Sequence, residues 1–498
     1  MTTVIEKELD LLRSADLIRL ASTEPDVEYL FRHALLQDAA YNLLLRGERQ
    51  VLHREVADVL ERLFPDRRDE LAAVLAHHYE RAEEWDRAIE YLVLAGRQAL
   101  RRFANREARD LLDRAAEHLD ASDLDSNLAL RVEVGLGRAQ AGFSFVPFDE
   151  NLALLEDTLR CAEELGDDHL LAAVHLQIGR VRSARGESYA TSPKLRTSLD
   201  EAVRLGATLG DRSVRALPLS LIGSARLASG DQAGAIEALE EALPILEAIE
   251  DYSSAALTAG TLGRALARAG DFEAARRASE AAQKMAERSG DPNVIVDTEI
   301  FAGIVAAEQG NLDEAIERTR EGVRLADEVG NTYCSLVGNF YLGDQHLRRG
   351  EPGDAVASIE RSRELAEFCD AGSIVSLSDA WMGAARAAGD TDELDAFEAP
   401  LQHARALGNR HGASLVLQLR ARARAAPPDP DWQGSIEDLR AAASDLEDLG
   451  ARPVLARVLA DLGRALAAAG RTDEAADASR RAEELAQSMG LNPEPPAF

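Results

Sequence analysis

Lysine, cysteine and aromatic residues are scarce in this chain of 498 residues. The cysteines are Cys161, Cys334 and Cys369, and no two of them form a C-x-x-C pair, so neither a disulfide framework nor a structural zinc site is expected. Lysine stands only at positions 7, 194 and 284, where the preceding residues are Glu, Pro and Gln. No phosphate-binding loop of the form G-x-x-x-x-G-K-[ST] can be drawn, so the chain is expected neither to bind nor to hydrolyse ATP.

Long apolar runs are also missing. No stretch of about 18 apolar residues exists and acidic residues occur early, so we expect neither a membrane span nor a signal peptide, and a cytoplasmic protein. The formal net charge of -32 would repel a phosphate backbone or an anionic membrane over most of the surface. We therefore expect no nucleic-acid or membrane partner. Because no motif indicates a metal, a cofactor or a catalytic site, none of these is predicted either.

The dominant pattern is a repeat of forty residues. An apolar or small residue followed by glycine recurs at this interval, in the pairs Ile222-Gly223, Leu262-Gly263, Ala302-Gly303, Leu342-Gly343 and Met382-Gly383. Further glycines mark the middle and the end of most units, as in Gly270-Asp271 and Gly290. Asp271 can cap a helix that Gly290 ends in the left-handed conformation, so each unit is predicted to be a hairpin of two helices.

One hairpin cannot bury both of its faces, so successive hairpins should stack into an all-α solenoid. The Leu-Gly, Gly-Asp and following alanine positions resemble the longer variant of the tetratricopeptide repeat, over roughly Leu71 to Gly490. This resemblance implies a right-handed superhelix whose groove is lined by the first helix of each hairpin. The unit from His411 to Gly450 carries "PPDPDW" in place of Gly-Asp and is expected to be distorted, and the tail "NPEPPAF" to be disordered.

The first 120 residues follow a different pattern. A helix, two short strands at Leu17–Leu20 and Glu28–Phe31, and a turn at Glu24-Pro25-Asp26 indicate the last part of a winged helix. Motifs between Glu8 and Leu119 resemble multidomain signal-transduction ATPases, in which a P-loop ATPase, often behind a cyclase or kinase domain, leads through a winged helix into a tetratricopeptide array. They are Phe31-Arg32-His33-Ala34, Gln37-Asp38, Ala76-His77-His78-Tyr79 and Asp86-Arg87-Ala88-Ile89. The predicted domains are a winged-helix remnant (1–45), a helical linker with first repeat-like helices (46–124), the repeats (125–490) and a tail (491–498).

Candidate ligand contacts follow from the repeat geometry. Positions just after the Leu-Gly pairs, and one helical turn further on, would face the groove. The candidate groove contacts are Arg180, Arg264, Arg268, Asp344, Arg348 and Arg464. Such a ladder could hold a peptide carboxylate or an acidic helix through bidentate hydrogen bonds. The alternative is that these are ordinary solvated residues of an arginine-rich protein.

Two insertions supply a second set of candidates. The segments Ala141–Asn151 and Ala184–Arg196 stand where short turns would otherwise be. Their aromatic residues could form an exposed anchor for a partner: Phe143, Phe145, Phe148 and Tyr189. The alternative is that they merely fill the turns.

Three hypotheses about function remain. The leading one is a non-catalytic interaction scaffold or sensor array of a signalling system, which binds a protein or peptide in its groove and possibly works with an ATPase or cyclase module. The second is a carboxy-terminal fragment of a larger signal-transduction ATPase or adenylate/guanylate cyclase. The third is a regulatory subunit of a transcriptional regulator.

Overall fold

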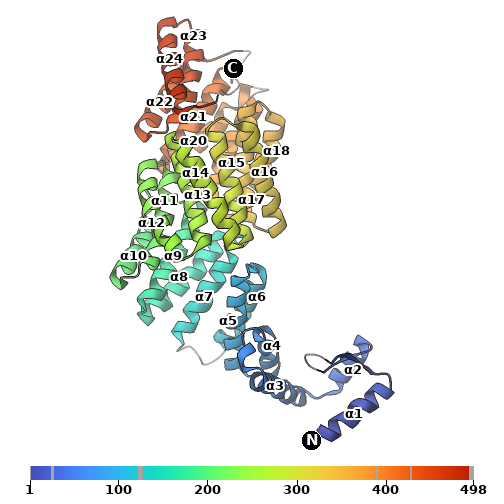
Figure 1. Cartoon of the computed structure of the whole chain (residues 1–498). Coiled ribbons are helices and arrows are strands. Elements are labelled where there is room, and N and C mark those ends of the chain that lie inside the picture. The colour runs from blue at the N-terminus through green and yellow to red at the C-terminus, as the bar shows by residue number, and fades with distance from the viewer. Residues whose placement is uncertain (1, 24–26, 122–126, 388–390, 427–428, 493–498) are drawn as a thin grey trace. The chain divides into compact units, whose positions relative to one another are not determined.

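The computed structural model describes residues 2–23, 27–121, 127–387, 391–426 and 429–492 (Figure 1). Within these ranges the chain forms 24 α-helices, one two-stranded sheet and two 3-10 helices. They belong to two compact units. The first unit holds residues 1–98 and 110–125, and the second holds residues 99–109 and 126–498.

The first unit opens with a small sheet between helices. Its elements are α1 (Thr2–Ser14), β1 (Ile18–Ser22), β2 (Glu28–Phe31) and α2 (Ala34–Leu43). The strands are antiparallel, with Ile18 opposite Phe31. The predicted order of helix, two strands and helix is therefore confirmed, whereas the predicted turn at residues 24–26 lies outside the described residues.

Helices α3 (Arg46–Leu63), α4 (Ala72–Ala82), α5 (Trp85–Arg101) and α6 (Asn105–Ala121) follow, with a short 3-10 helix at Pro65–Arg67. Glu61 of α3 ties α3 to its neighbours, since it accepts hydrogen bonds from Tyr79 at 2.6 Å and from Arg87 and Tyr91. Burial alone would raise the pKa of Glu61, but these hydrogen bonds hold it below its usual value.

The second unit is a succession of helical hairpins, which Figure 1 shows packed side by side. The hairpins are α7 (Leu128–Gly142) with α8 (Phe148–Leu165), α9 (Asp168–Arg185) with α10 (Pro193–Leu209), α11 (Arg212–Ser229) with α12 (Gln232–Ala248), α13 (Tyr252–Ala269) with α14 (Phe272–Ser289), α15 (Pro292–Glu308) with α16 (Leu312–Val329), α17 (Thr332–Arg349) with α18 (Pro352–Cys369), α19 (Gly372–Ala387) with α20 (Glu398–Ala406), α21 (Arg410–Arg424) with α22 (Trp432–Leu449), and α23 (Arg452–Ala468) with α24 (Thr472–Met489). The predicted all-α array of hairpins, similar to tetratricopeptide repeats, is confirmed.

The glycine and aspartate marks act as predicted in the hairpin of α13 and α14. The Asp271 carboxylate accepts a hydrogen bond from the backbone N–H of Ala274 at 3.0 Å and so caps α14, and Gly290 ends α14 with φ of 66°. Gly263 lies where the two helices meet, because a Cβ added there would stand 3.1 Å from the carbonyl oxygen of Ala275. The repeated glycine thus permits close helix packing.

The second unit coils back on itself after five hairpins. The turn before α8 meets the start of α17, where the backbone N–H of Thr332 donates to the carbonyl oxygen of Ser144 at 3.0 Å. Thr191, before α10, donates to the carbonyl oxygen of Leu407, after α20, at 3.1 Å and across 216 residues. Buried residues of α7, α8 and α9 share one hydrophobic core with residues of α17 and α18. Hairpins five repeats apart therefore pack against each other.

The least regular hairpin is that of α19 and α20, one unit before the predicted unit from His411 to Gly450. Helix α20 is short and follows a 3-10 helix at Thr391–Phe397, whereas α21 and α22 still form a regular hairpin despite the "PPDPDW" segment, of which residues 427–428 lie outside the described ones. In the predicted tail, the backbone N–H of Asn492 donates to the carbonyl oxygen of Gln309 at 2.9 Å, and residues 493–498 lie outside the described range. Within the described part of the chain, no helix has the length and apolar character needed to cross a membrane.

Candidate ligand-binding cavity

A cavity of about 880 Å³ lies inside the second unit. Its wall is built mainly from the first helices of the hairpins, α9, α11, α13, α15, α17, α19, α21 and α23. These helices face inward because the second helices of the hairpins carry the exposed charged face. Because the coil closes on itself, first helices of hairpins that are far apart in sequence line one common space.

Five of the six predicted groove contacts line this cavity. They are Arg180, Arg264, Arg268, Asp344 and Arg348. Arg464 is not among the lining residues and forms an ion pair with Asp461 on its own helix. The binding role of these residues stays a prediction, but the structure brings five of them to one space.

The insertion aromatics are packed within the array. Phe148 is fully buried, which corrects the expectation of an exposed anchor at that position. Phe143 lines the cavity, and both phenylalanine rings contact Tyr333 of α17, at centroid distances of 5.6 and 5.7 Å. Phe145 and Tyr189 are half-buried. Phe143 and Phe148 are covered because the closure of the coil brings Tyr333 of α17 against the turn between α7 and α8.

An aromatic ladder runs along three successive first helices. Phe301, Tyr341 and Trp381 occupy the same repeat position, forty residues apart, and all three line the cavity. The indole N–H of Trp381 donates to Asp344 at 2.9 Å, which fixes the ring. The three rings add aromatic surface to the cavity wall.

Two arginines of the wall lie against aromatic rings. The guanidinium carbon of Arg180 is 3.9 Å from the centroid of Phe143, and that of Arg264 is 4.8 Å from the centroid of Phe301. Arg264 also donates to the hydroxyl of Tyr341 at 3.2 Å. Burial lowers the pKa of Arg180 from its ordinary value. Both groups are thus held rigidly at the wall, as cation–π contacts favour.

Arg268 and Arg348 make the same kind of hydrogen bond in two different repeats. Arg268 donates to the carbonyl oxygen of Leu227 at 3.0 Å, and Arg348 donates to that of Ala307. Each carbonyl lies 41 residues upstream, near the end of the preceding first helix. The two carbonyl oxygens also accept the backbone N–H groups of Gly230 and Gly310, so each guanidinium group adds a second hydrogen bond at the end of that helix.

Asp297 interrupts the apolar lining. At the same repeat position the neighbouring first helices carry Leu257, Val337 and Leu377, which also line the cavity. Asp297 accepts a hydrogen bond from the thiol of Cys334 at 3.1 Å. Burial raises the pKa of Asp297 to about 6, despite the favourable charges of nearby arginines.

A buried ion pair lies in the cavity wall and joins α15 to α23. Arg457 and Glu308 approach to 3.1 Å across 149 residues, and their side chains are 10% and 11% exposed. Burial opposes the charged form of Glu308, but the charges of Arg457, Arg348 and Arg268 lower its pKa to about 2. His411 lies in the same region, and burial lowers its pKa to about 3, so it is neutral at physiological pH.

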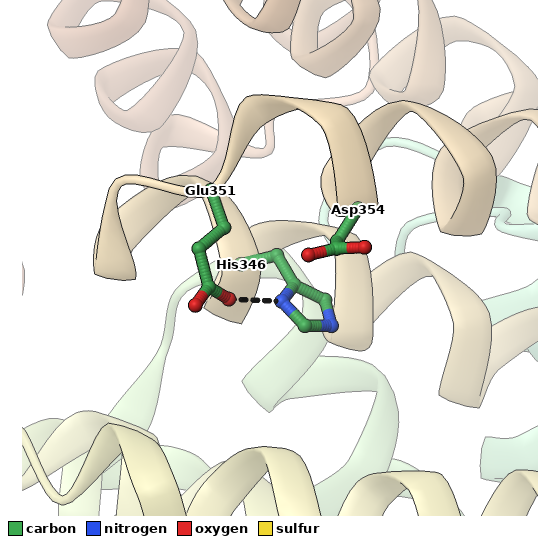
Figure 2. A group of neighbouring side chains, drawn as sticks. All are labelled: His346, Glu351 and Asp354. Carbon is green, nitrogen blue, oxygen red and sulfur yellow. Dashed lines mark hydrogen bonds and ion pairs between the residues drawn. The ribbon is translucent and has the colours of Figure 1, made fainter.

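One group of side chains in the described residues has the composition of a cation site. Figure 2 shows His346, Glu351 and Asp354 at the turn between α17 and α18, with potential ligand atoms within 4.8 Å of one another. His346 contacts Glu351 at 2.7 Å, and the other carboxylate oxygen of Glu351 pairs with Arg349 at 2.6 Å. Glu351 is thus already engaged by two neighbours, and the arrangement is explained as a brace of the hairpin turn.

Comparison with known proteins gives matches only at low sequence identity or over a short segment. No known family matches its sequence. An uncharacterized protein from Rhizobium meliloti (strain 1021) is 32% identical over 142 residues, which span 27% of this chain and 13% of that protein. The chain therefore matches only a small part of that relative's length.

Solved structures with a similar arrangement are helical-repeat proteins. A Rap protein complexed with competence and sporulation factor is 14% identical, with a TM-score of 0.47 over 81% of this chain and 98% of the other. The complex of Cut9 and Hcn1 gives 16% identity and a TM-score of 0.48 over 90% and 89%. A signal-transduction ATPase with a tetratricopeptide repeat sensor from Pyrococcus horikoshii gives 14% and 0.40 over 76% and 56%. These likenesses describe the fold alone.

Proposed function

We propose that the chain is a non-catalytic recognition module that binds a short peptide, or an extended segment of a protein, in the cavity of its second unit. The observation that supports this proposal is the cavity of about 880 Å³, which is lined mainly by first helices of the hairpins. Its volume lies within the range of roughly 300–1,000 Å³ that is typical of ligand sites. An aromatic ladder beside rigid polar groups also has the composition of such sites.

The test fills the cavity without changing the outer surface. Ser224 of α11 lines the cavity, so Ser224→Trp should occupy it, whereas Thr208→Trp on the exposed side of α10 is the matched control. A pool of random N-acetylated hexapeptides is passed with each protein over a gel-filtration column, and retained peptides are measured by mass spectrometry. We expect retention by the wild type and by Thr208→Trp, and at least tenfold less by Ser224→Trp. Equal retention of peptides by the two variants would show that the cavity is not the binding site.

A second candidate function is the sensory part of a larger signal-transduction ATPase or nucleotide cyclase. The observation that favours it is the small sheet between α1 and α2, which fits the last part of a winged helix in that class of proteins. An immunoblot of cells of the source organism, with an antibody against the repeat array, tests it. A band near 53.9 kDa contradicts this second candidate, and a much larger band supports it.

A further inference from the structure

Three arginines of the cavity wall have no carboxylate partner. Among the described residues, no carboxylate oxygen lies within 4.0 Å of a guanidinium nitrogen of Arg180, Arg264 or Arg268. By contrast, Arg348 pairs with Asp344 at 3.5 Å. A charge removed from water without a counter-ion costs free energy, so an unpaired arginine in a cavity is favourable only if something compensates it.

The surroundings of Arg180 and Arg264 suit a bound anion. Each guanidinium group lies against an aromatic ring, and the Nε atom of Arg264 is buried without an acceptor. A guanidinium stacked on a ring keeps its N–H groups in its own plane, where two of them can bind both oxygens of one carboxylate. Arg268 is less available, because it already donates to the carbonyl oxygen of Leu227.

Asp297 does not neutralise these two arginines. The charges of Arg180 and Arg264 both act on its carboxyl group, but neither arginine comes within ion-pair distance, and Asp297 accepts the thiol of Cys334 instead. Its raised pKa leaves part of the carboxyl groups protonated near neutral pH. Asp291 also lines the cavity and its charge acts on Arg180, but it forms no ion pair with Arg180 either. Arg180 and Arg264 therefore stand in this wall without a carboxylate bonded directly to them.

We propose that Arg180 and Arg264 form an anion-binding pair, and that the ligand of the cavity carries a carboxylate next to an apolar or aromatic group. The inference rests on the proposed function and adds the chemical class of the ligand. The carboxylate lies against the two guanidinium groups, and the apolar part packs on the aromatic ladder of Phe301, Tyr341 and Trp381. A carboxylate carries one negative charge and a phosphate dianion carries two, so Asp291 and Asp297 in the same wall oppose a carboxylate less than a phosphate.

The test compares two pools of random N-acetylated hexapeptides, one ending in a free carboxyl group and the other in a carboxamide. Peptides retained by the full chain in gel filtration are measured by mass spectrometry. We expect at least tenfold more retention from the acid pool, and a fall to the level of the amide pool in R180Q and R264Q. R464Q is the matched control and should keep the preference, since Arg464 has the same repeat position as Arg264 but lies outside the cavity lining.

A second arm separates a peptide terminus from a small carboxylate. The binding of 3-phenylpropionate, 3-phenylpropionamide and phenethyl phosphate to the full chain is measured by calorimetry. Binding of the acid alone, weakened at least tenfold in R264Q, supports the arginine pair even when no peptide is retained, and that result would contradict the peptide function only.

Three results would overturn the inference. The first is retention of acid and amide peptides by the wild type in equal, measurable amounts. This result does not depend on the folding of any variant, and it would leave peptide recognition itself in place. The second is tighter binding of the phosphate than of 3-phenylpropionate. The third is the absence of binding by every acid probe, peptide or small molecule.

Discussion

The ion pair between Glu308 and Arg457 joins helices that are distant in sequence, so its removal should loosen the closed coil. At neutral pH, a pKa of about 2 for Glu308 against about 4.3 in an unfolded chain corresponds to about 3 kcal/mol of stability. Glu308→Gln keeps the shape of the side chain but removes the charge. It leaves Arg457 without its ion-pair partner and removes a negative charge that also acts on Arg348 and Arg268. We therefore expect the variant to lose about 3 kcal/mol at pH 7.

The contribution of Glu308 to the free energy of unfolding should also depend on pH. Because folding lowers the pKa of Glu308, its contribution is complete above about pH 4.3 and is lost as the pH falls towards 2. The difference between wild type and Glu308→Gln should therefore be constant from pH 7 to pH 5 and should shrink below that.

Hydrogen exchange, followed by mass spectrometry, is the appropriate assay, because a long repeat array need not unfold in one step. Amides of α15 and α23 should exchange about 100-fold faster in Glu308→Gln at pH 7, while those of α3 keep their rate. Glu447→Gln is the control, because Glu447 forms an exposed pair with Arg481 at 3.2 Å and should have no measurable effect. A change below threefold in α15 and α23 would refute the reasoning.

Three further predictions concern packing and ionisation. Gly263→Leu should cost roughly 1–3 kcal/mol in urea unfolding, because the new side chain overfills the contact of α13 with α14, and an unchanged midpoint would contradict this. Phe148→Ala should cost about 3–5 kcal/mol, whereas Phe368→Ala at a half-exposed site should cost far less, and equal effects would show that Phe148 is not a core residue. Folding raises the pKa of Asp297, so its contribution to stability is lost as the pH rises through about 6. The melting temperature of Asp297→Asn should therefore fall less between pH 5 and pH 7.5 than that of the wild type. A larger fall in the variant would contradict the predicted sign.

The hairpins were predictable because their signals are local. A cap such as Asp271 and a helix-ending residue such as Gly290 act within a few residues, and an apolar position next to glycine records contact with the neighbouring helix. The inward position of Arg180 and Arg264 followed from the same repeat geometry. The aromatic ladder was equally visible as a period of forty residues, although only the structure shows that it lines a cavity.

The closure of the coil was not predictable from the repeat alone. A repeat pattern specifies how one hairpin packs on the next, but the contact of Arg457 with Glu308 depends on small rotations added over 149 residues. For the same reason the burial of Phe148 was missed, since Tyr333 reaches it only when the coil has completed a turn. The bonds of Arg268 and Arg348 to carbonyl groups of the preceding repeat are contacts between neighbours, but no motif in the sequence indicates them.

The contact between hairpins five repeats apart also limits how such a chain can evolve. An open solenoid tolerates the duplication or deletion of a unit, because each unit meets only its two neighbours. Here the insertion of one forty-residue unit between Thr191 and Leu407 would place a different turn opposite Thr191 and misalign every later contact of this kind. The number of units between these two turns is therefore fixed by geometry, and lineages of this protein should vary in the sequence of these units while keeping their number.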